Sequence, residues 1–373
     1  MLDGGTMMNE LSRRDLGRLL GIGAVAATLP PLFAQNQPPR SSRRGGIRLS
    51  ANENPYGPST SAANAMRDAM RLVNRYPDEA QDELVTTIAK LHDVSADHVI
   101  LGDGSSEILK LTAAAFSSPT RKVVMADPTF EAMGEYARAS GAEVVKVPLT
   151  SAYAHDLEKM AGVPSAGVIY VCNPNNPTAS ITTKQNVRAF LQSLPQDTIA
   201  LVDEAYFHYA DSPDYESVIP LVQMRPNLVV ARTFSKIFGM AGIRCGYAIA
   251  QPSLIRRMNQ QKAWDSMNVV ALAGAQASLL DTAHVVEGRK RNSQTRDEVV
   301  NAVKQMGYEV VPSQANFIMI NLRRGVRPVI DSMRANGVHV GRLFPALPQH
   351  LRVTIGTPEE MRSFVTAFRT VAA

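Results

Sequence analysis

Short apolar runs alternate with longer stretches of mixed polarity through the middle of the chain. The runs cover residues 98–101, 122–126, 167–172, 199–202, 228–231 and 247–250. Each run has the length of a strand, and segments of helical length separate most of them. Continuous apolar strands that alternate with helices are typical of a mainly parallel sheet with helices on both faces. The pattern therefore predicts an α/β fold.

The chain changes character after about residue 252. Its segments become longer and more helical, and strand-like runs return at 317–320 and 351–355 before a last helix. Thr357 suits the N-cap of that helix, with Pro358 and Glu360 in its first turn. We therefore expect a large cofactor domain over residues 47–270 and a smaller C-terminal domain over 271–373. An N-terminal arm, 47–58, is expected to pack on the small domain.

The N-terminus carries Arg13 and Arg14 shortly before an apolar stretch at 19–29. Paired arginines before a short apolar region are typical of a twin-arginine export signal, although a chance pair before an amphipathic segment is the alternative. The stretch is too short to span a bilayer, which takes about 20 residues. We expect an export signal over 1–34, a flexible linker over 35–46 and no stable membrane span. The protein would be periplasmic or exported, or cytoplasmic if the leader is not functional.

Composition limits the class of protein. The chain has 373 residues, 45% of them hydrophobic and 20% charged, as expected for a soluble globular protein with a sizeable core. Its net charge of +5 lies mostly in four arginines between residues 40 and 48, so the rest lacks the basic surface of a nucleic-acid-binding protein. Cys172 and Cys245 are expected to be buried rather than bonded to each other. The seven histidines show no metal-ligand spacing, and no metal site is predicted.

Three charged residues suggest the chemistry. Lys236 follows Asp203 by 33 positions, and Arg244 follows Lys236 by eight. This order suits a pyridine ring held at its nitrogen, its aldehyde and its phosphate, as in pyridoxal phosphate (PLP). Asp203 ends an apolar run, so it should lie at the carboxyl edge of the sheet, where α/β proteins bind ligands. Apolar neighbours favour a neutral, nucleophilic amine at Lys236, although a surface lysine and a turn-capping aspartate are the plainer alternatives.

Further motifs could complete a cofactor site. Tyr206 and Asn176, the latter in a loop with two prolines, could contact the ring's 3′ oxygen. Ser105 and Ser106 open a helix after two glycines, where free amides favour a phosphate. Ser235 would add to that site, and Phe130 could stack on the ring. Taken singly, each motif also fits an ordinary loop or core residue.

Together these motifs resemble the class I/II aminotransferases of the aspartate-aminotransferase fold (PLP fold type I), especially the histidinol-phosphate aminotransferase group. The resemblance runs from about residue 47 to the C-terminus. Its most specific pieces are residues 51–58, 75–78, 173–178, 203–206 and 235–244.

The resemblance implies roles for individual residues. Lys236 would hold PLP and act in catalysis with Asp203 and Tyr206. Arg352 would grip the substrate's carboxylate or phosphate. The remaining residues implied in cofactor binding are Ser105, Ser106, Phe130, Asn176, Ser235 and Arg244, and those implied in substrate binding are Asn54, Asn316 and Arg342.

The family's quaternary structure bears on Tyr76. In the family this tyrosine reaches the phosphate of the neighbouring subunit, which implies a homodimer with shared active sites. Relatives often place an arginine for the substrate phosphate shortly before the position of Arg352. Arg342 lies near that place, so histidinol phosphate and a free amino acid both remain candidate substrates.

The function expected is PLP-dependent transfer of an amino group between an amino acid, or an amino alcohol phosphate, and a 2-oxo acid. A PLP-dependent decarboxylase or lyase on the same scaffold is one alternative. A non-catalytic exported binding protein is another. Export and a cytoplasmic biosynthetic substrate such as histidinol phosphate pull in opposite directions, which leaves the amino donor open.

Overall fold

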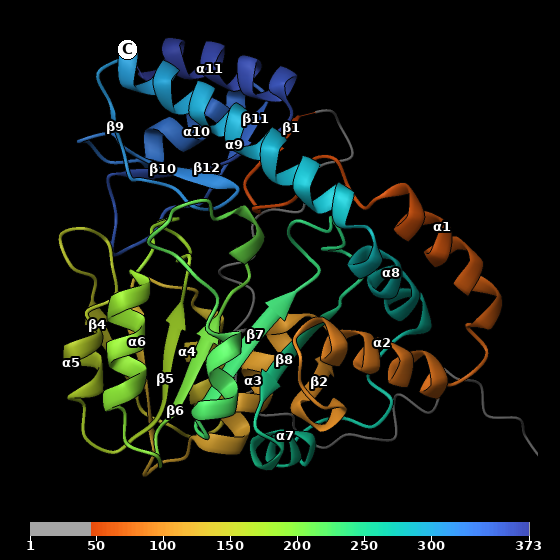
Figure 1. The fold of residues 1–373 in the computed structure, drawn as a ribbon. Helices are drawn as coiled ribbons and strands as arrows, with labels where there is room; N and C mark the ends of the chain where they lie inside the picture. Colours follow the sequence, from red (N-terminus) through yellow and green to blue (C-terminus); the bar gives the residue numbers. More distant parts are fainter. Residues whose placement is uncertain (1–45, 373) are drawn as a thin grey trace, which may run out of the picture. The chain divides into compact units, whose positions relative to one another are not determined.

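The computed structural model describes residues 46–372. The expected export signal, and all of the expected linker except Gly46, lie outside the described residues. The elements from the arm to the last helix are drawn in Figure 1.

A seven-stranded sheet forms the larger part of the described chain (Figure 1). Its strand order is β2-β8-β7-β6-β5-β3-β4, and β8 runs in the direction opposite to the other six strands. This confirms the α/β fold with a mainly parallel sheet. The strands are β2 (Val99–Gly102), β3 (Lys122–Asp127), β4 (Val144–Pro148), β5 (Ala166–Cys172), β6 (Ile199–Asp203), β7 (Leu228–Thr233) and β8 (Gly246–Ala250).

Both faces of this sheet are buried, which explains its continuous apolar strands. In β5, Ile169 and Val171 join one core cluster, while Val168, Tyr170 and Cys172 join a second. Successive side chains of a strand point to opposite faces, so these two clusters lie on opposite sides. The first cluster is covered by α2 (Asp78–Leu91), α5 (Leu157–Ala161), α6 (Lys184–Ser193) and α8 (Val269–Leu280). The second is covered by α3 (Ser105–Phe116), α4 (Ala132–Ala139) and α7 (Pro252–Asn259).

The C-terminal part has a core of its own. An antiparallel sheet of β9 (Glu309–Val310), β10 (Phe317–Asn321) and β12 (His350–Thr354) packs with α9 (Thr282–Gln305), α10 (Arg327–Ala335) and α11 (Pro358–Ala372). The arm joins this core, because β1 (Ile47–Leu49) pairs in parallel with β11 (Val338–Val340). Leu49 is 1% exposed there. The last helix begins as expected, with Thr357 and Glu360 exchanging hydrogen bonds between side chain and backbone of 3.3 and 2.8 Å.

The boundary expected between residues 270 and 271 falls inside α8. Buried residues of α8, Ala271, Leu272 and Ala275, belong to the first cluster of the large sheet, and the helix packs against α1 (Thr60–Ala69) and α2. After Leu49 of the arm, the next residue along the chain that belongs to the small-domain core is Val299 of α9. Helical character alone did not show on which core α8 packs.

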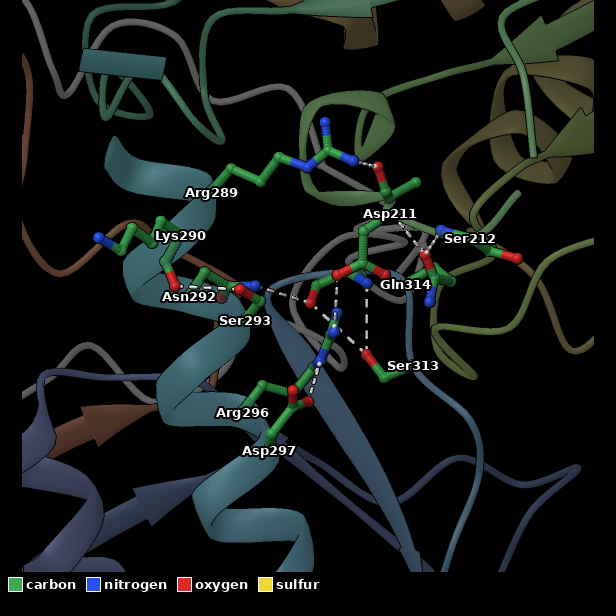
Figure 2. Close-up of polar contacts among 12 residues, drawn as sticks. Asp211, Ser212, Arg289, Lys290, Asn292, Ser293, Arg296, Asp297, Ser313 and Gln314 are labelled. Atoms are coloured by element: carbon green, nitrogen blue, oxygen red, sulfur yellow. Dashed lines mark hydrogen bonds and ion pairs between the residues drawn. The ribbon is translucent and has the colours of Figure 1, made fainter. Parts of the chain in front are cut away.

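Polar contacts fasten α9 and the loop before β10 to the segment after β6 (Figure 2). Gln314 accepts hydrogen bonds from the backbone amides of Asp211 and Ser212, at 2.7 and 2.9 Å. Arg296 of α9 is 6% exposed and pairs with Asp211 at 3.2 Å. These contacts join the C-terminal part to the loops at the carboxyl edge of the large sheet.

The short 3-10 helices are Met70–Leu72, Ala96–His98, Phe207–Tyr209 and Ile219–Met224. Cys172 and Cys245 are both buried and free, which confirms the expectation for the thiols. Within residues 46–372 no single helix is long and apolar enough to cross a bilayer; α8 and α9, bent by 80° at the break between them, meet that test only as a pair.

Candidate active site

Lys236 lies in the loop between β7 and β8, among buried aromatic and aliphatic neighbours. Phe234, Ile237 and Phe238 are all at most 3% exposed. The Lys236 amine donates a hydrogen bond to the backbone oxygen of Asn52 at 3.2 Å. Burial is the largest cause that lowers the pKa of Lys236 to about 8, and the nearby charge of Arg352 adds to it. A large fraction of this amine is therefore neutral and nucleophilic at mildly alkaline pH.

Asp203 is the last residue of β6 and lies at the carboxyl edge of the sheet, as predicted. Its Oδ2 accepts a hydrogen bond from the Tyr170 hydroxyl at 2.9 Å, and its Oδ1 accepts one from the amide of Ala205 at 3.1 Å. The residue is 3% exposed, and burial raises the pKa of its carboxyl to about 6. A buried carboxylate with this pKa is well suited to pair with a protonated ring nitrogen, because the cation would offset the loss of water.

Tyr206 connects three parts of the chain. Its hydroxyl accepts a hydrogen bond from the side-chain amide of Asn52 at 3.0 Å, and its ring meets Phe317 of β10 edge-on with centroids 5.1 Å apart. Lys236 Nζ lies 5.4 Å from the centroid of the Tyr206 ring. The arm, the end of β6, the lysine loop and the small domain thus meet at one place.

A cradle suited to an anion forms where α3 begins. Gly104 precedes α3 with φ +77°, and a Cβ there would lie 2.0 Å from Nη2 of Arg244. Arg244 Nη1 also lies 3.4 Å from the Ser235 hydroxyl. Ser105 and Ser106 begin the helix, whose first backbone amides are free to bind a ligand. A guanidinium, hydroxyls and helix amides form the donor set that a phosphate dianion requires.

Arg352 of β12 is 8% exposed and faces the same region. Its Nη1 donates to Oδ1 of Asn176 at 2.7 Å and its Nη2 to the backbone oxygen of Ser50 at 2.7 Å. Its Nε is buried with no hydrogen-bond partner among the described residues. Burial lowers the pKa of Arg352 to about 10, so the guanidinium remains charged at neutral pH. An arginine with an unsatisfied buried donor is suited to bind a substrate anion.

The structure therefore brings together Lys236, Asp203, Tyr206, Asn176 and Arg352, and it gathers Ser105, Ser106, Ser235 and Arg244 in the anion cradle. These residues fit PLP: an amine for its aldehyde, a buried carboxylate for its ring nitrogen and the cradle for its phosphate. Within the described residues no cluster of His, Cys, Asp or Glu could hold a metal ion.

Other candidate residues have different neighbours. The Asn54 side chain donates to the backbone oxygen of Ile237 at 2.8 Å and accepts from the amide of Tyr56 at 3.0 Å, so it fixes the arm to the lysine loop. The Asn316 side chain donates to the backbone oxygens of Asn52 and Glu53, both at 3.1 Å.

The last three candidates, Phe130, Tyr76 and Arg342, differ in their burial and in their contacts. Phe130 is partly buried against the second core cluster. Tyr76 is 77% exposed. Arg342 forms an ion pair with Glu131 and donates to the backbone oxygen of Leu343 at 3.1 Å.

Two contributors were missed from the sequence. Tyr170 carries the only side-chain hydroxyl in the strand Ala166–Cys172, and a buried tyrosine needs a hydrogen-bond partner, which was a usable signal. Asn52 supplies both its side chain and its backbone oxygen to the site, from a residue with φ +54°. Asparagine tolerates that left-handed conformation better than most residues do.

The chain is similar in sequence to known aminotransferases. The family model for class I and II aminotransferases matches residues 44–368. The chain is 37% identical to a histidinol-phosphate aminotransferase of Moorella thermoacetica, over 88% of this chain and 86% of the relative. It is 38% identical to the Symbiobacterium thermophilum enzyme of the same name, over 87% and 90% of the two chains.

Solved structures of histidinol-phosphate aminotransferases are similar to this chain in fold. A structure from Erwinia carotovora atroseptica superposes with a TM-score of 0.85 at 32% identity, over 87% of this chain and 95% of the other. The histidinol-phosphate aminotransferase of Sinorhizobium meliloti, in complex with pyridoxal-5′-phosphate, superposes with a TM-score of 0.82 at 26% identity, over 87% and 90% of the two chains.

Proposed function

Because the chain belongs to the class I and II aminotransferase family and is a PLP-dependent transaminase, we propose that it exchanges an amino group between an α-amino acid and a 2-oxo acid. The observation that carries this choice of substrate is Arg352, a buried guanidinium beside Asn176 with one donor unsatisfied among the described residues. Both an amino acid and a 2-oxo acid present a carboxylate that this arginine can bind through two hydrogen bonds.

The residues act on different atoms. When bound, PLP supplies an electron sink for negative charge at the substrate Cα. Arg352 fixes the carboxylate and so orients the Cα–H bond. Lys236 would hold the cofactor aldehyde, and its free amine would carry the proton at the substrate Cα as a general acid and base. Asp203 would keep the ring nitrogen protonated, and the cradle around Arg244 would hold the phosphate.

A second candidate substrate is an amino alcohol phosphate. The relatives named as histidinol-phosphate aminotransferases, at 33–38% identity over most of the chain, support it. Arg342 lies in the segment where a phosphate-binding arginine is expected. In that case Arg352 or Arg342 would bind the phosphate in place of a carboxylate.

A donor screen tests the proposal. Purified PLP-loaded protein is mixed with glutamate, aromatic amino acids, basic amino acids and histidinol phosphate, one at a time. An active donor should bleach the visible band of the bound cofactor and yield a keto product with pyridoxamine phosphate. Lys236→Ala should remove both the band and the transfer. Release of carbon dioxide without pyridoxamine phosphate would instead support the decarboxylase alternative.

We also propose a homodimer with shared active sites. The segment after α1 exposes Met70, Leu72, Val73 and Tyr76, each at more than 50% of its surface. Adjacent exposed apolar side chains often mark protein–protein contacts. Trp264, 95% exposed, is a second apolar residue suited to such an interface.

For residues 1–34 we propose a twin-arginine export signal, supported by Arg13 and Arg14 before the apolar stretch. Fractionation of cells that make the full chain tests it. Export should require the arginine pair, so Arg13→Lys with Arg14→Lys should leave the protein in the cytoplasm. If the unaltered chain stays in the cytoplasm to the same extent as this variant, export is contradicted and the case for a biosynthetic substrate becomes stronger.

A further inference from the structure

An ion pair lies beside the substrate arginine. Glu131, just before α4, pairs with Arg342, which follows β11, so the pair connects the large sheet's helical layer to the C-terminal part. Arg342 and Arg352 both lie against the ring of Phe344, at 4.4 and 5.1 Å from its centroid to their guanidinium carbons. Phe344 is 5% exposed, so both cations lie beside one buried ring.

Backbone contacts hold the segments that carry Arg342 and Arg352 close together. Gly341 donates from its amide to the backbone oxygen of Arg352 at 2.8 Å, and a Cβ on Gly341 would lie 2.9 Å from the Cβ of Arg352. Only a glycine allows the chain before Arg342 to lie this close to Arg352. The charges of Arg342 and Glu131 are both felt at Arg352, where the first lowers its pKa and the second raises it.

The ion pair is exchangeable. The side chains of Arg342 and Glu131 are 34% and 41% exposed, and pairs with this much contact with water contribute little to stability. A phosphate or carboxylate on a substrate anchored at Arg352 could therefore compete with Glu131 for Arg342. The displaced carboxylate has space beside it, because a cavity of about 90 Å³ is lined by Glu131, Lys146 and Phe344.

We propose that Glu131 is a specificity-determining residue whose carboxylate occupies Arg342 in place of the distal anionic group of a substrate. Substrates with a second anion, a carboxylate or a phosphate, displace Glu131 and bind both arginines. Substrates without one leave the Glu131–Arg342 pair intact, so Arg342 is not left without a counter-ion beside Arg352. This inference rests on the proposed function, since it assigns the second anion to the substrate of that same site.

Matched substrates test the proposal. The acceptors are a five-carbon 2-oxo dicarboxylate and the five-carbon 2-oxo monocarboxylate, and the donors are an α-amino acid that carries a side-chain phosphate and the same amino acid without the phosphate. For Glu131→Gln we expect the KM of each doubly anionic substrate to fall about fivefold relative to its partner, because the internal competitor has lost its charge. For Arg342→Gln we expect the same ratio to move about tenfold the other way. If the KM ratio changes only for the carboxylate pair, the second anion that the site binds is a carboxylate. If it changes only for the phosphate pair, the second anion is a phosphate.

A double variant and a control complete the design. If Glu131 acts through Arg342, adding Glu131→Gln to Arg342→Gln should change the ratio no further. Glu135→Gln alters a nearby carboxylate, in the first turn of α4, that pairs with Arg138 at 2.7 Å, and it should leave all ratios unchanged. Equal changes for singly and doubly anionic substrates in Glu131→Gln would overturn the proposal, since a merely structural role would produce them.

Calorimetry separates this inference from the proposed function. Non-reacting five-carbon dicarboxylate and monocarboxylate are titrated into the PLP-loaded protein and its variants, with no amino transfer required. Tighter dicarboxylate binding in Glu131→Gln supports the inference even if none of the donors reacts, whereas an unchanged preference contradicts it even if amino transfer is found.

Discussion

The amine of Lys236 is buried among aromatic and aliphatic side chains, and burial lowers its pKa to about 8. Only the neutral amine attacks an aldehyde, so attachment of PLP to cofactor-free enzyme should speed up about tenfold per pH unit below this pKa and level off above it. Stopped-flow absorbance from pH 6 to 10 measures the rate. An attachment rate that still rises steeply at pH 10 would mean an amine with the ordinary pKa of lysine. Lys236→Ala should form no covalent adduct at any pH.

The buried carboxyl of Asp203 should lower the stability of the cofactor-free protein and support its activity once PLP is bound. Burial raises its pKa from 3.8 to about 6, so between these values the folded protein binds more protons than the unfolded chain. The free energy of unfolding should therefore fall as pH rises from about 4 to 6. In cofactor-free Asp203→Asn this contribution disappears, and at pH 7 the variant should be at least as stable as the parent, with a gain of up to about 3 kcal/mol.

Activity should move in the opposite direction in Asp203→Asn. A neutral amide cannot keep the ring nitrogen protonated, and we expect turnover to drop by about 10²-fold or more. Denaturant unfolding from pH 4 to 8 and turnover with one donor measure the two effects. Tyr170→Phe keeps the carboxylate and removes one hydrogen bond of 2.9 Å, so its loss of turnover should be much smaller. A destabilised Asp203→Asn protein at pH 7 would show that the carboxylate is not strained by burial.

Individual site residues could be predicted from the sequence when a strand end or a helix start placed them. Asp203 ends an apolar strand and Ser105 begins a helix, so local pattern was enough. The partners of these residues were harder to find. Asn52 reaches Tyr206 across 154 positions of sequence and Glu131 reaches Arg342 across 211, and no local periodicity records such contacts.

At the scale of elements, the capping box of α11 gives a stability prediction. Thr357→Ala removes the hydroxyl that accepts a hydrogen bond from the Glu360 amide at 3.3 Å. We expect a loss of about 1 kcal/mol in the free energy of unfolding, the usual cost of a lost N-cap. Phe364 and Phe368 of α11 are buried in the small-domain core. We therefore expect α11 to stay packed on that core in the variant while the free energy of unfolding falls.

Urea unfolding of Thr357→Ala measures this loss against a control. Ser363→Ala lies in the same helix, where the hydroxyl only bonds back to the Glu359 carbonyl at 3.1 Å and is exposed. Its stability should stay within about 0.5 kcal/mol of the parent. Equal stability of Thr357→Ala and the parent would mean that the cap contributes nothing.

Strands of the large sheet could be predicted because burial on both faces makes them continuously apolar, and all six predicted runs became strands with their ends shifted by at most two residues. Packing partners could not be predicted in the same way. The apolar helix α8 carries no sequence signal that distinguishes one core from the other, so the core on which it packs could not be predicted. Gln314 likewise fastens the C-terminal part to residues more than a hundred positions earlier (Figure 2).

At the scale of the whole molecule, the proposed homodimer places Tyr76 of one subunit in the active site of the other. Tyr76 is 77% exposed, so Tyr76→Phe should leave its own subunit's core unchanged while weakening the partner's site. Mixed with Lys236→Ala, it should form hybrid dimers in which one site has both an intact lysine and an intact tyrosine. Dissociated and reassociated mixtures should therefore be more active than either parent variant.

The matched control mixes Lys236→Ala with Asp203→Asn. These residues lie in one subunit's site, where Asp203 is among the charges that shift the pKa of Lys236, so no hybrid of the two regains an intact site. The Tyr76→Phe mixture should gain activity and the Asp203→Asn mixture should not, with size-exclusion chromatography showing that both reassociate. If Tyr76 served its own subunit, the two mixtures would behave alike, because each hybrid would then keep one defect in both of its sites.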